Sequence, residues 1–455
     1  MFQRILIANR GEIAVRIIRT CREMEIETVA VYSTADADAL HVQLATRAVC
    51  IGGPKGAESY LNMSAILTAA LETGCDAVHP GYGFLSENRE FADLCAKCGL
   101  TYIGPTGDMI AKMGNKAAAR ALMQAADVPV VPGSQGALAD SERAAELAEE
   151  IGYPVLLKAS AGGGGRGMRR VDSPEQMKGL FEAARSEATA CFGDGELYLE
   201  KLILNPKHIE FQILADQRGN VVHLGERDCS IQRKNQKLIE ESPSKGLSSR
   251  LRSEMGAAAV RAARAAGYVN AGTVEFVLDS QGHYYFIEMN TRIQVEHPVT
   301  EWLSGLDLIR EQIRIAAGLP LSFSQEEVEL RGCSIECRIN AEDPQKGFAP
   351  SPGRADFVHF PGGPGVRVDS ALYSGCWASP YYDSLVAKVS VHAPTRLEAI
   401  RRMRRALEEL IIEGFTTNCD LSHLILYHPD FVRGRYDTSF LETHMEELMK
   451  WNRGD

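Results

Sequence analysis

The chain has 455 residues, a net charge of −11, and a composition that is 45% hydrophobic and 24% charged. This length suggests about three globular domains, and the acidic balance argues against a nucleic-acid-binding protein. The sequence contains no run of about 18 apolar residues, so no membrane span is expected. The start of the chain lacks the apolar stretch of a signal peptide, and we therefore expect a cytoplasmic protein.

The first hundred residues alternate between strand and helix patterns, which predicts a parallel sheet covered by helices. Residues 5–8 and 28–32 are apolar runs typical of buried strands, and apolar residues recur at helical spacing between them. The turn at residues 9–12 lacks the G-x-G-x-x-G pattern of dinucleotide-binding folds, so no nicotinamide cofactor is expected. Residues 79–84 combine turn formers with aromatic residues, as in a site loop or an ordinary loop.

The eleven cysteines are an odd number spread along the chain, which predicts reduced thiols rather than a disulfide framework. Cys95 and Cys98 have the Cys-x-x-Cys spacing of a redox or zinc site. No second pair with suitable spacing exists, so we interpret this pair as a coincidence near a helix end. Cys333 and Cys337 are expected to pack in the core.

The pattern changes from about residue 130. We expect a helix over residues 141–150, a strand over 154–158, and largely antiparallel strands over 197–300. A third region, from about residue 330, contains Pro/Gly-rich turns and ends in a charged helix over 395–410.

A run of four glycines, Gly162 to Gly165, follows the strand that ends at Lys158. Consecutive glycines leave backbone N–H groups free to approach a polyanion, which favours phosphate binding over a flexible surface loop. The run does not match the Walker pattern, so it is not a P-loop.

Two glutamates lie on adjacent strand-like runs, residues 273–278 and 284–289. With a two-residue hairpin loop at Gln281-Gly282, Glu275 pairs directly with Glu288, and their Cβ atoms lie about 5 Å apart. Like charges between apolar neighbours are unfavourable without a cation, and hard oxygen ligands indicate Mg²⁺ or Mn²⁺. Two exposed glutamates on an edge hairpin are the alternative.

Polar residues then occupy every second position, as on one face of a continuing strand. The row comprises Glu288, Asn290, Arg292, Gln294 and Glu296. A second row of the same kind comprises His208, Glu210 and Gln212, with apolar residues on the opposite face. We interpret these rows as ligand- or metal-binding faces rather than solvated strand faces.

Six motifs together make the sequence similar to the ATP-grasp superfamily and, within it, to biotin carboxylase, over essentially the whole chain. They lie at residues 7–14 (IANRGEIA), 79–87 (HPGYGFLSE), 162–168 (GGGGRGM), 288–300 (EMNTRIQVEHPVT), 336–343 (ECRINAED) and 380–384 (PYYDS). The resemblance implies an α/β and α+β fold: an N-terminal parallel-sheet domain (1–113), a central ATP-grasp domain (114–328) with a mobile glycine-rich lid (about 131–202), and a C-terminal biotin-carboxylase domain (329–446).

The resemblance implies a ligase that uses ATP and bicarbonate to carboxylate biotin at N1 through carboxyphosphate. The biotin is expected on a separate carrier protein, because the chain lacks the Met-Lys-Met attachment turn. A separate carboxyltransferase is also implied. The setting is then acetyl-CoA carboxylase and malonyl-CoA supply for fatty-acid synthesis, or a two-subunit pyruvate, propionyl-CoA or other acyl-CoA carboxylase. Two further alternatives are an ATP-grasp ligase for another carboxylate and an inactive nucleotide-binding regulator.

The resemblance also assigns nucleotide and metal contacts. It places Lys116, Lys158, Gly164, Gly165, Glu200, Lys201, Leu202, Ile203, His208, Asn235, Glu275 and Glu288 at ATP, with Glu200 to Ile203 lining the adenine pocket through their backbone. It makes Glu275, Glu288 and Asn290 the ligands of two Mg²⁺ or Mn²⁺ ions. Asn235 stands where some relatives carry histidine, and Leu202 where several carry an aromatic residue, which puts nucleotide affinity in doubt.

The remaining assignments concern catalysis. The resemblance assigns the bicarbonate site to Lys237, Arg292, Gln294, Val295 and Arg338. It makes Glu296 the general base. It places Tyr82, Arg338 and Asp383 around biotin, with Arg338 stabilising the biotin enolate. The catalytic set is Glu296, Arg292, Arg338 and Lys237. Arg19 and Glu23 match positions at a family dimer interface, so a homodimer is expected.

Overall fold

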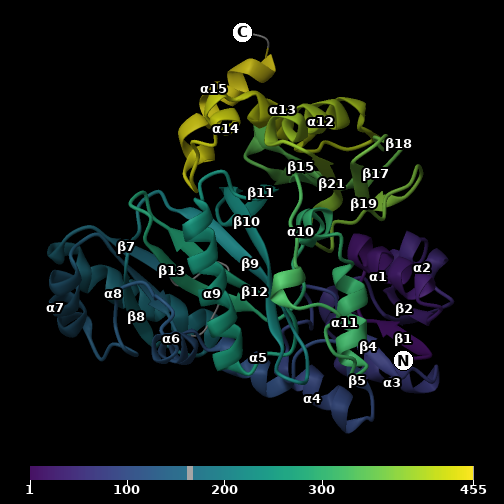
Figure 1. Ribbon diagram of the computed structural model, residues 1–455, viewed down its shortest axis with the longest axis horizontal. Helices are drawn as coiled ribbons and strands as arrows, with labels where there is room; N and C mark the ends of the chain where they lie inside the picture. Colours follow the sequence, from purple (N-terminus) through teal and green to yellow (C-terminus); the bar gives the residue numbers. More distant parts are fainter. Residues whose placement is uncertain (161–167, 454–455) are drawn as a thin grey trace.

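The N-terminal region forms the parallel sheet that its strand and helix pattern predicts (Figure 1). The computed structural model describes residues 1–160 and 168–453. In strand order β3-β2-β1-β4-β5, every neighbouring pair is parallel. Ile5 and Ile7 belong to one buried core and Leu6 to another, because successive side chains of a strand face opposite sides of the sheet.

The elements of this region alternate along the chain. The strands are β1 (Arg4–Ile7), β2 (Glu27–Ser33), β3 (Arg47–Gly52), β4 (Ala77–His79) and β5 (Thr101–Tyr102). The helices are α1 (Gly11–Glu23), α2 (Leu40–Leu44), α3 (Met63–Glu72), α4 (Arg89–Lys97) and α5 (Gly107–Gly114), with 3-10 turns η1 (Thr34–Asp36) and η2 (Gly56–Glu58).

A three-stranded antiparallel sheet follows α6 (Lys116–Ala125) and lies at the left of Figure 1. Its middle strand is β6 (Val155–Ala159), between β7 (Met168–Val171) and β8 (Leu197–Lys201). Helices α7 (Ser141–Ile151) and α8 (Pro174–Phe192) share its buried core. The expected helix at 141–150 and strand at 154–158 are therefore confirmed. Gly164 and Gly165 lie outside the described residues.

An eight-stranded antiparallel sheet joins the central and C-terminal regions, in order β13-β12-β9-β10-β11-β14-β21-β19. The β11–β14 pair makes this connection, so the two regions share one continuous sheet. The strands are β9 (Lys207–Ala215), β10 (Val221–Arg233), β11 (Gln236–Ser242), β12 (Asn270–Leu278), β13 (Tyr284–Asn290), β14 (Cys333–Asn340), β19 (Val366–Ser370) and β21 (Leu385–Ala393).

The sequence analysis missed α9 (Ser249–Ala266), an 18-residue helix within the stretch that we expected to be largely strands. Its alanine-rich face, including Ala258, Ala259 and Ala262, is fully buried in the core that also holds Ile209 and Phe211 of β9. Small side chains let the helix approach the sheet closely, and alanine is the best intrinsic helix former. Two shorter helices, α10 (His297–Ser304) and α11 (Leu308–Ala316), follow β13.

The C-terminal region covers β14 and β21 with helices. The expected charged helix is α12 (Arg396–Glu409), which begins with a capping box between Thr395 and Glu398. The other helices are α13 (Cys419–Tyr427), α14 (Pro429–Arg433) and α15 (Phe440–Arg453). Short elements complete the region: η3 (Gln325–Glu327), η4 (Pro344–Lys346), and the strand pairs β15 (Glu342–Asp343) with β16 (Ala349–Pro350), β17 (Gly353–Arg354) with β20 (Trp377–Ala378), and β18 (Phe357–His359) with β22 (Ile411–Glu413).

All eleven cysteines lie in the described ranges as free thiols. Cys95 is buried in α4, and the described groups with metal-ligand geometry include neither Cys95 nor Cys98. Cys337 is fully buried and Cys333 packs against the same core, as expected. Within residues 1–160 and 168–453, no helix combines the length and apolar character needed to cross a membrane.

The buried histidine of α2 gives a prediction for the pH dependence of stability. Burial lowers the pKa of His41 to about 4 from its ordinary value of 6.5. As pH falls through this interval, the unfolded chain binds a proton that the folded chain does not, so stability is lost. We expect His41→Gln to reduce the loss of unfolding free energy between about pH 7.5 and about pH 4.5 by about 2–3 kcal/mol, measured by urea unfolding.

The control is His359→Gln, because His359 is exposed on β18. It should leave the pH dependence of the wild type unchanged. Parallel curves for His41→Gln and the wild type would contradict the prediction.

Candidate active site

A cavity of about 1050 Å³ lies where the three regions meet. Its wall includes Tyr82 from the N-terminal region, Lys158 from β6, Lys237 from β11 and Arg338 from β14. Every described residue that the resemblance assigned to ATP, metal, bicarbonate or biotin contributes to this wall, whereas Glu210 and Gln212 of the second polar row are buried behind it. The cavity thus brings together residues from near both ends of the chain, from Asn9 to Thr438.

The facing glutamates on β12 and β13 are confirmed, although the predicted loop between them is wrong. Glu275 pairs directly with Glu288. The N–H of Asp279 donates to the carbonyl of His283 at 2.9 Å, so the loop has three residues, with Gly282 at a φ of 89°. The register shifts by one residue between Glu275 and Phe276, and this bulge compensates for the longer loop.

The polar row that continues from Glu288 was predicted to be one strand, and this prediction is wrong beyond Asn290, where β13 ends. The Thr291 N–H donates to the Glu87 side chain at 3.0 Å rather than to a neighbouring strand. Residues 295 and 296 form a turn, and α10 begins at His297 with a proline in its first turn. The chain therefore bends along the cavity instead of crossing it.

The side chains of this bent segment still meet in the cavity. Arg292 donates to Gln294 Oε1 at 2.6 Å and to Asn290 Oδ1 at 3.2 Å. Its Nε donates to Glu87 Oε2 at 3.1 Å, which fixes the direction of the guanidinium. Gln294 in turn donates to Glu275 Oε1 at 2.9 Å. Asn290, Arg292 and Gln294 of the row therefore form one hydrogen-bonded set, although the strand ends at Asn290.

The ammonium of Lys237 lies among three buried carboxylates. Its Nζ is 2.6 Å from Glu210, 2.7 Å from Glu296 and 3.2 Å from Glu275. Burial raises the pKa of these carboxyls, but the neighbouring cations together, with Lys237 the strongest of them, hold the pKa of Glu275 and Glu296 well below the ordinary value. Both groups are therefore carboxylates at neutral pH.

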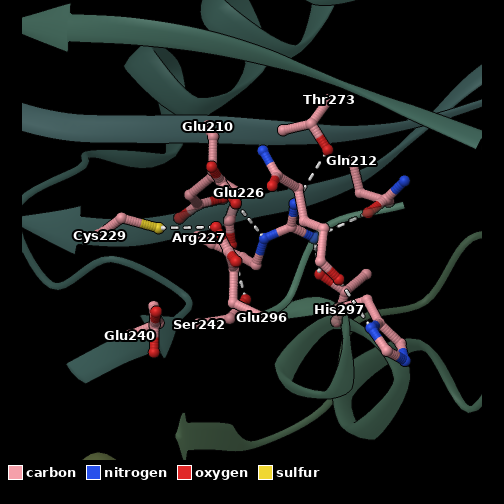
Figure 2. A network of polar contacts seen from close by, with 12 residues as sticks. Glu210, Gln212, Glu226, Arg227, Cys229, Glu240, Ser242, Thr273, Glu296 and His297 are labelled. Carbon is pink, nitrogen blue, oxygen red and sulfur yellow. Dashed lines mark hydrogen bonds and ion pairs between the residues drawn. The ribbon is translucent and has the colours of Figure 1, made fainter. Parts of the chain in front are cut away.

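Arg227 holds Glu210 of this cluster, and Figure 2 shows Arg227 beside Glu210, Gln212 and Thr273. Its fully buried guanidinium donates to Glu210, and to Gln212 Oε1 at 2.8 Å and Thr273 Oγ1 at 3.1 Å. The alternating row on β9 is thus confirmed as a buried polar face, with Ile209, Phe211 and Ile213 in the core behind it. Arg227 thus provides the hydrogen-bond donors that the buried side-chain oxygens of Glu210 and Gln212 need.

Glu296 also contacts a second cation. Arg338 donates from Nη2 to Glu296 Oε2 at 2.8 Å and from Nε to Glu240 Oε1 at 2.6 Å. Burial raises the pKa of Glu240 to about 7, although Arg338 opposes this rise. Glu296 therefore lies between Lys237 and Arg338, with one carboxylate oxygen on each.

The opposite end of the cavity carries the groups expected at the nucleotide. The Lys158 ammonium contacts Glu200, and Arg120 donates to the same carboxylate at 3.3 Å. Lys116 Nζ lies 3.7 Å from Glu288, and His208 Nε2 lies 2.7 Å from Glu275 Oε2. The Glu200 side chain is thus engaged by both cations, and Glu200, Lys201, Leu202 and Ile203 all contribute to the cavity wall.

The backbone conformation at position 235 explains why an asparagine occupies it. Lys234 and Asn235 are the two loop residues between β10 and β11, at φ values of 47° and 66°. Asparagine tolerates this left-handed conformation better than most residues do. Its side chain still reaches the cavity wall.

The carboxylate pair fits a hard divalent cation. Glu275, Glu288 and the amide oxygen of Asn290 are oxygen donors on paired strands, with Thr273 opposite Asn290 in the same register. Glu275 accepts from Lys237, Asn290, Gln294 and His208, so its charge is compensated by protein donors alone. Glu288 is 39% exposed and faces the cavity, where a cation has access to it.

Tyr82 and Asp383 border the remaining part of the cavity. The Tyr82 hydroxyl donates to Glu12 on α1, and Asp383 accepts from the Leu385 N–H at 2.8 Å. Tyr382, next to Asp383, lies under the Arg10 guanidinium at 4.1 Å from the ring centre. The contact between Arg10 and Tyr382 attaches the 380–384 loop to the N-terminal region.

Several residues of the site escaped the sequence analysis. Glu226, Arg227 and Asp228 form a charged run that is typical of an exposed strand, yet all three are buried. Glu87 and Glu240 also hold arginines of the site. Only Glu87 carried a signal, since it lies within the 79–87 motif.

Comparison with known proteins agrees with this architecture. Family models match residues 1–110 (biotin carboxylase, N-terminal domain), 115–324 (carbamoyl-phosphate synthase L chain, ATP binding domain) and 336–443 (biotin carboxylase C-terminal domain). Biotin carboxylase 1 of Bacillus subtilis (strain 168) is 56% identical over 445 residues, covering 98% of this chain and 99% of that protein. The chain belongs to the biotin carboxylase family.

Other members of the family include the 2-oxoglutarate carboxylase small subunit of Hydrogenobacter thermophilus, 54% identical over 98% of this chain and 94% of that protein. The crystal structure of its biotin carboxylase domain dimer with MgADP, ADP and bicarbonate has a TM-score of 0.94 at 53% identity, covering 98% of this chain and 99% of that one. A Campylobacter jejuni biotin carboxylase–β-γ-ATP complex has a TM-score of 0.95 at 50% identity, with the same coverage. The fold predicted from the sequence, with its N-terminal parallel sheet, central ATP-grasp domain and C-terminal biotin-carboxylase domain, is confirmed.

The contacts of Lys237 predict how its loss depends on pH. Glu275 and Glu296 stabilise the fold above their unfolded pKa of 4.5 because Lys237 lowers their folded pKa values. Lys237→Met leaves three buried carboxylates without this cation. We expect a loss of about 3–5 kcal/mol in unfolding free energy at about pH 8, and a smaller loss at about pH 5, where the carboxyls can take up protons.

Urea unfolding at the two pH values measures this difference. Lys237→Arg keeps a cation and serves as the matched control, with a smaller loss at about pH 8. An equal deficit of Lys237→Met at both pH values would show that packing, rather than charge, accounts for it.

Proposed function

We propose that the chain carboxylates biotin at N1 on a separate carrier protein, with ATP and bicarbonate as substrates and carboxyphosphate as the intermediate. The placement of Glu296 carries this proposal. Its ionised carboxylate contacts Lys237 and Arg338 and lies on the same bent segment as Arg292. A base, an oxyanion fork and two further cations are thus within one cavity.

Bicarbonate is a poor electrophile, and phosphorylation activates it. We propose that Arg292, with Gln294, Lys237, Arg338 and the Val295 backbone, binds the planar anion, because a guanidinium fork matches two oxygens. Glu296 then takes the bicarbonate proton as a bicarbonate oxygen attacks the γ-phosphorus of ATP, and the bond from the γ-phosphorus to the bridging oxygen breaks to release ADP. The Glu87 contact holds the Arg292 fork in place for this step.

The carboxyphosphate then breaks down to CO₂ and phosphate beside the biotin ring. We propose that the released phosphate takes the N1 proton of biotin and that Arg338 stabilises the enolate, which adds to CO₂. Tyr82 and Asp383 border this part of the cavity and are proposed to position the ring. Exclusion of water protects carboxyphosphate from hydrolysis, and residues 131–202, including Gly164 and Gly165, are proposed as the covering lid.

At the nucleotide end, Lys116, Lys158 and His208 are proposed to contact the phosphates or ribose. Residues 200–203 and Asn235 would border the base. Glu275, Glu288 and Asn290 are proposed to hold two Mg²⁺ or Mn²⁺ ions. When bound, such ions neutralise phosphate charge. Lys237 and His208 meanwhile keep Glu275 ionised.

The biological setting is also a proposal. The relatives include biotin carboxylases and a 2-oxoglutarate carboxylase small subunit. We propose acetyl-CoA carboxylase, with separate carrier and carboxyltransferase chains, in the cytoplasm, and keep the 2-oxoacid carboxylase as the second candidate. The proposed domains are 1–113, 114–328 and 329–446. A homodimer with α1 at its interface is also proposed, because Arg19 and Glu23 are exposed on this helix. The biotin carboxylase domain of a relative forms a dimer.

Glu296→Gln tests the proposed base. We expect bicarbonate-dependent ATP cleavage to fall about 100-fold or more, because the amide cannot accept the proton, while MgADP affinity stays within about twofold. Cleavage is measured with and without bicarbonate and free biotin. Glu311→Gln alters a buried glutamate of α11 outside the cavity wall of the described residues, and should keep full activity.

Stimulation of the wild type by biotin, strictly dependent on bicarbonate, is the expected result. Stimulation by an amino acid or another carboxylate, without a biotin effect, would instead identify a different ligase.

A further inference from the structure

A buried ammonium behind the cavity joins segments from distant parts of the chain. Lys388 of β21 has a fully buried side chain. Its Nζ donates to the carbonyl oxygen of Val295 at 2.7 Å and lies 3.1 Å from Glu12 Oε1. Val295 immediately precedes Glu296 in the turn before α10. Lys388 thus anchors the backbone that carries the proposed base, although it does not line the cavity formed by residues 1–160 and 168–453.

Glu12 extends this anchor to the other side of the cavity. It lies in the first turn of α1 and accepts a hydrogen bond from the Tyr82 hydroxyl. Burial raises the pKa of Glu12, and Lys388 opposes this rise. The contacts therefore run without interruption from Tyr82 through Glu12 and Lys388 to the carbonyl of Val295.

The other carboxyl groups near Lys388 are engaged elsewhere or make no hydrogen bond to it. Asp369 pairs with Lys388 in the β19–β21 register, but its carboxylate accepts from Arg367 at 2.7 Å and 3.2 Å. Both side-chain oxygens of Glu336 on β14 lack a hydrogen-bond partner among the described residues, so Glu336 does not hold Lys388. Glu12 is therefore the carboxylate that holds Lys388, and the Val295 carbonyl is its second partner.

A buried lysine in the middle of a strand costs free energy that a packed apolar side chain would avoid. Stability alone therefore does not account for Lys388. Its two partners lie on segments that border the proposed bicarbonate and biotin positions. Catalytic groups misplaced by about 1 Å lose a large part of their effect.

We propose that Lys388 is a positioning residue: it fixes the Val295–Glu296 turn and, through Glu12, holds that turn at a set distance from Tyr82. The inference rests on the proposed function, because it assigns Lys388 a role in the reaction that Glu296 is proposed to begin. Lys388 acts through the backbone and through Glu12, and touches no reacting atom.

The first test is Lys388→Met, which keeps the length of the side chain but removes the ammonium. We expect kcat for bicarbonate-dependent ATP cleavage to fall about tenfold or more, while the dissociation constant of MgADP, measured by calorimetry, stays within about twofold. Among the described residues, none of those proposed to contact the nucleotide hydrogen-bonds to Lys388, Glu12 or the Val295 carbonyl. A general structural defect would instead lower kcat and weaken MgADP binding together.

The matched control is Arg396→Met. Arg396 of α12 forms a buried ion pair with Glu241 of β11 at 2.7 Å, and neither residue is on the cavity wall that the described residues form. We expect a similar fall in the thermal midpoint but a rate within about twofold of the wild type. A rate loss in Arg396→Met equal to that of Lys388→Met would overturn the proposal.

Glu12→Gln decides the question if Lys388→Met does not fold, since glutamine conserves the size of the side chain. Because Glu12 reaches the turn only through Lys388 but contacts Tyr82 directly, we expect the biotin-stimulated rate to fall about tenfold and the biotin-independent rate about threefold. Equal losses in both rates, or no loss, would reject the proposal. A wild type without bicarbonate-dependent cleavage would reject the proposed function itself, whereas an active wild type with unaffected variants would reject only the role of Lys388.

Discussion

The Lys237 ammonium is the interaction on which the geometry of the cavity depends. It forms ion pairs with three carboxylates that come from β9, from β12 and from the turn before α10. Without a cation at their centre, these groups could not be ionised so close together inside the protein. Arg227 and Arg338 complete the compensation, each holding one glutamate of the cluster from the side. Charge balance thus fixes how the glutamate side chains of these three segments point.

The continuous sheet explains how these charges reach one place. Lys237 lies on β11 and Arg338 on β14, and these neighbouring strands carry the paired residues Glu240 and Glu336. The C-terminal region is therefore an extension of the central sheet at the site. The N-terminal region contributes through loops at the ends of its parallel strands, where Tyr82 and Glu87 follow β4. This is the usual position of functional loops in parallel sheets.

The sequence predicted those features that depend on local pattern. Alternation identified β12 and β13 and the polar face of β9, and the facing of Glu275 and Glu288 followed from pairing. The prediction failed where a distant contact changes the local conformation. Glu87 captures the Thr291 N–H, which ends β13 and bends the polar row. No local pattern reports a partner more than 200 residues away in the chain.

The same limit applies to the residues that were missed. Glu226, Arg227 and Asp228 have the composition of an exposed strand, and only the tertiary structure places Glu210, Arg252 and Lys207 against them. α9 was missed because its alanine-rich sequence lacks the large apolar residues that mark a helix face. The motifs were sufficient to identify residues of the cavity wall. The charged residues that support them from behind could be identified only from the structure.

Buried charge is an expensive way to stabilise a fold, since packed apolar side chains of similar volume often do as well or better. The cavity nevertheless concentrates ionised groups on both of its sides. A preorganised polar site has a different advantage: its dipoles and charges are already oriented when charge develops on the substrate, so little reorganisation is needed during reaction. The short contacts of Glu296 with Lys237 and Arg338 fit this principle, because the carboxylate is held in one orientation before any substrate arrives. Burial of these groups lowers the stability of the fold, and the fixed electrostatic environment that they provide explains why they are buried.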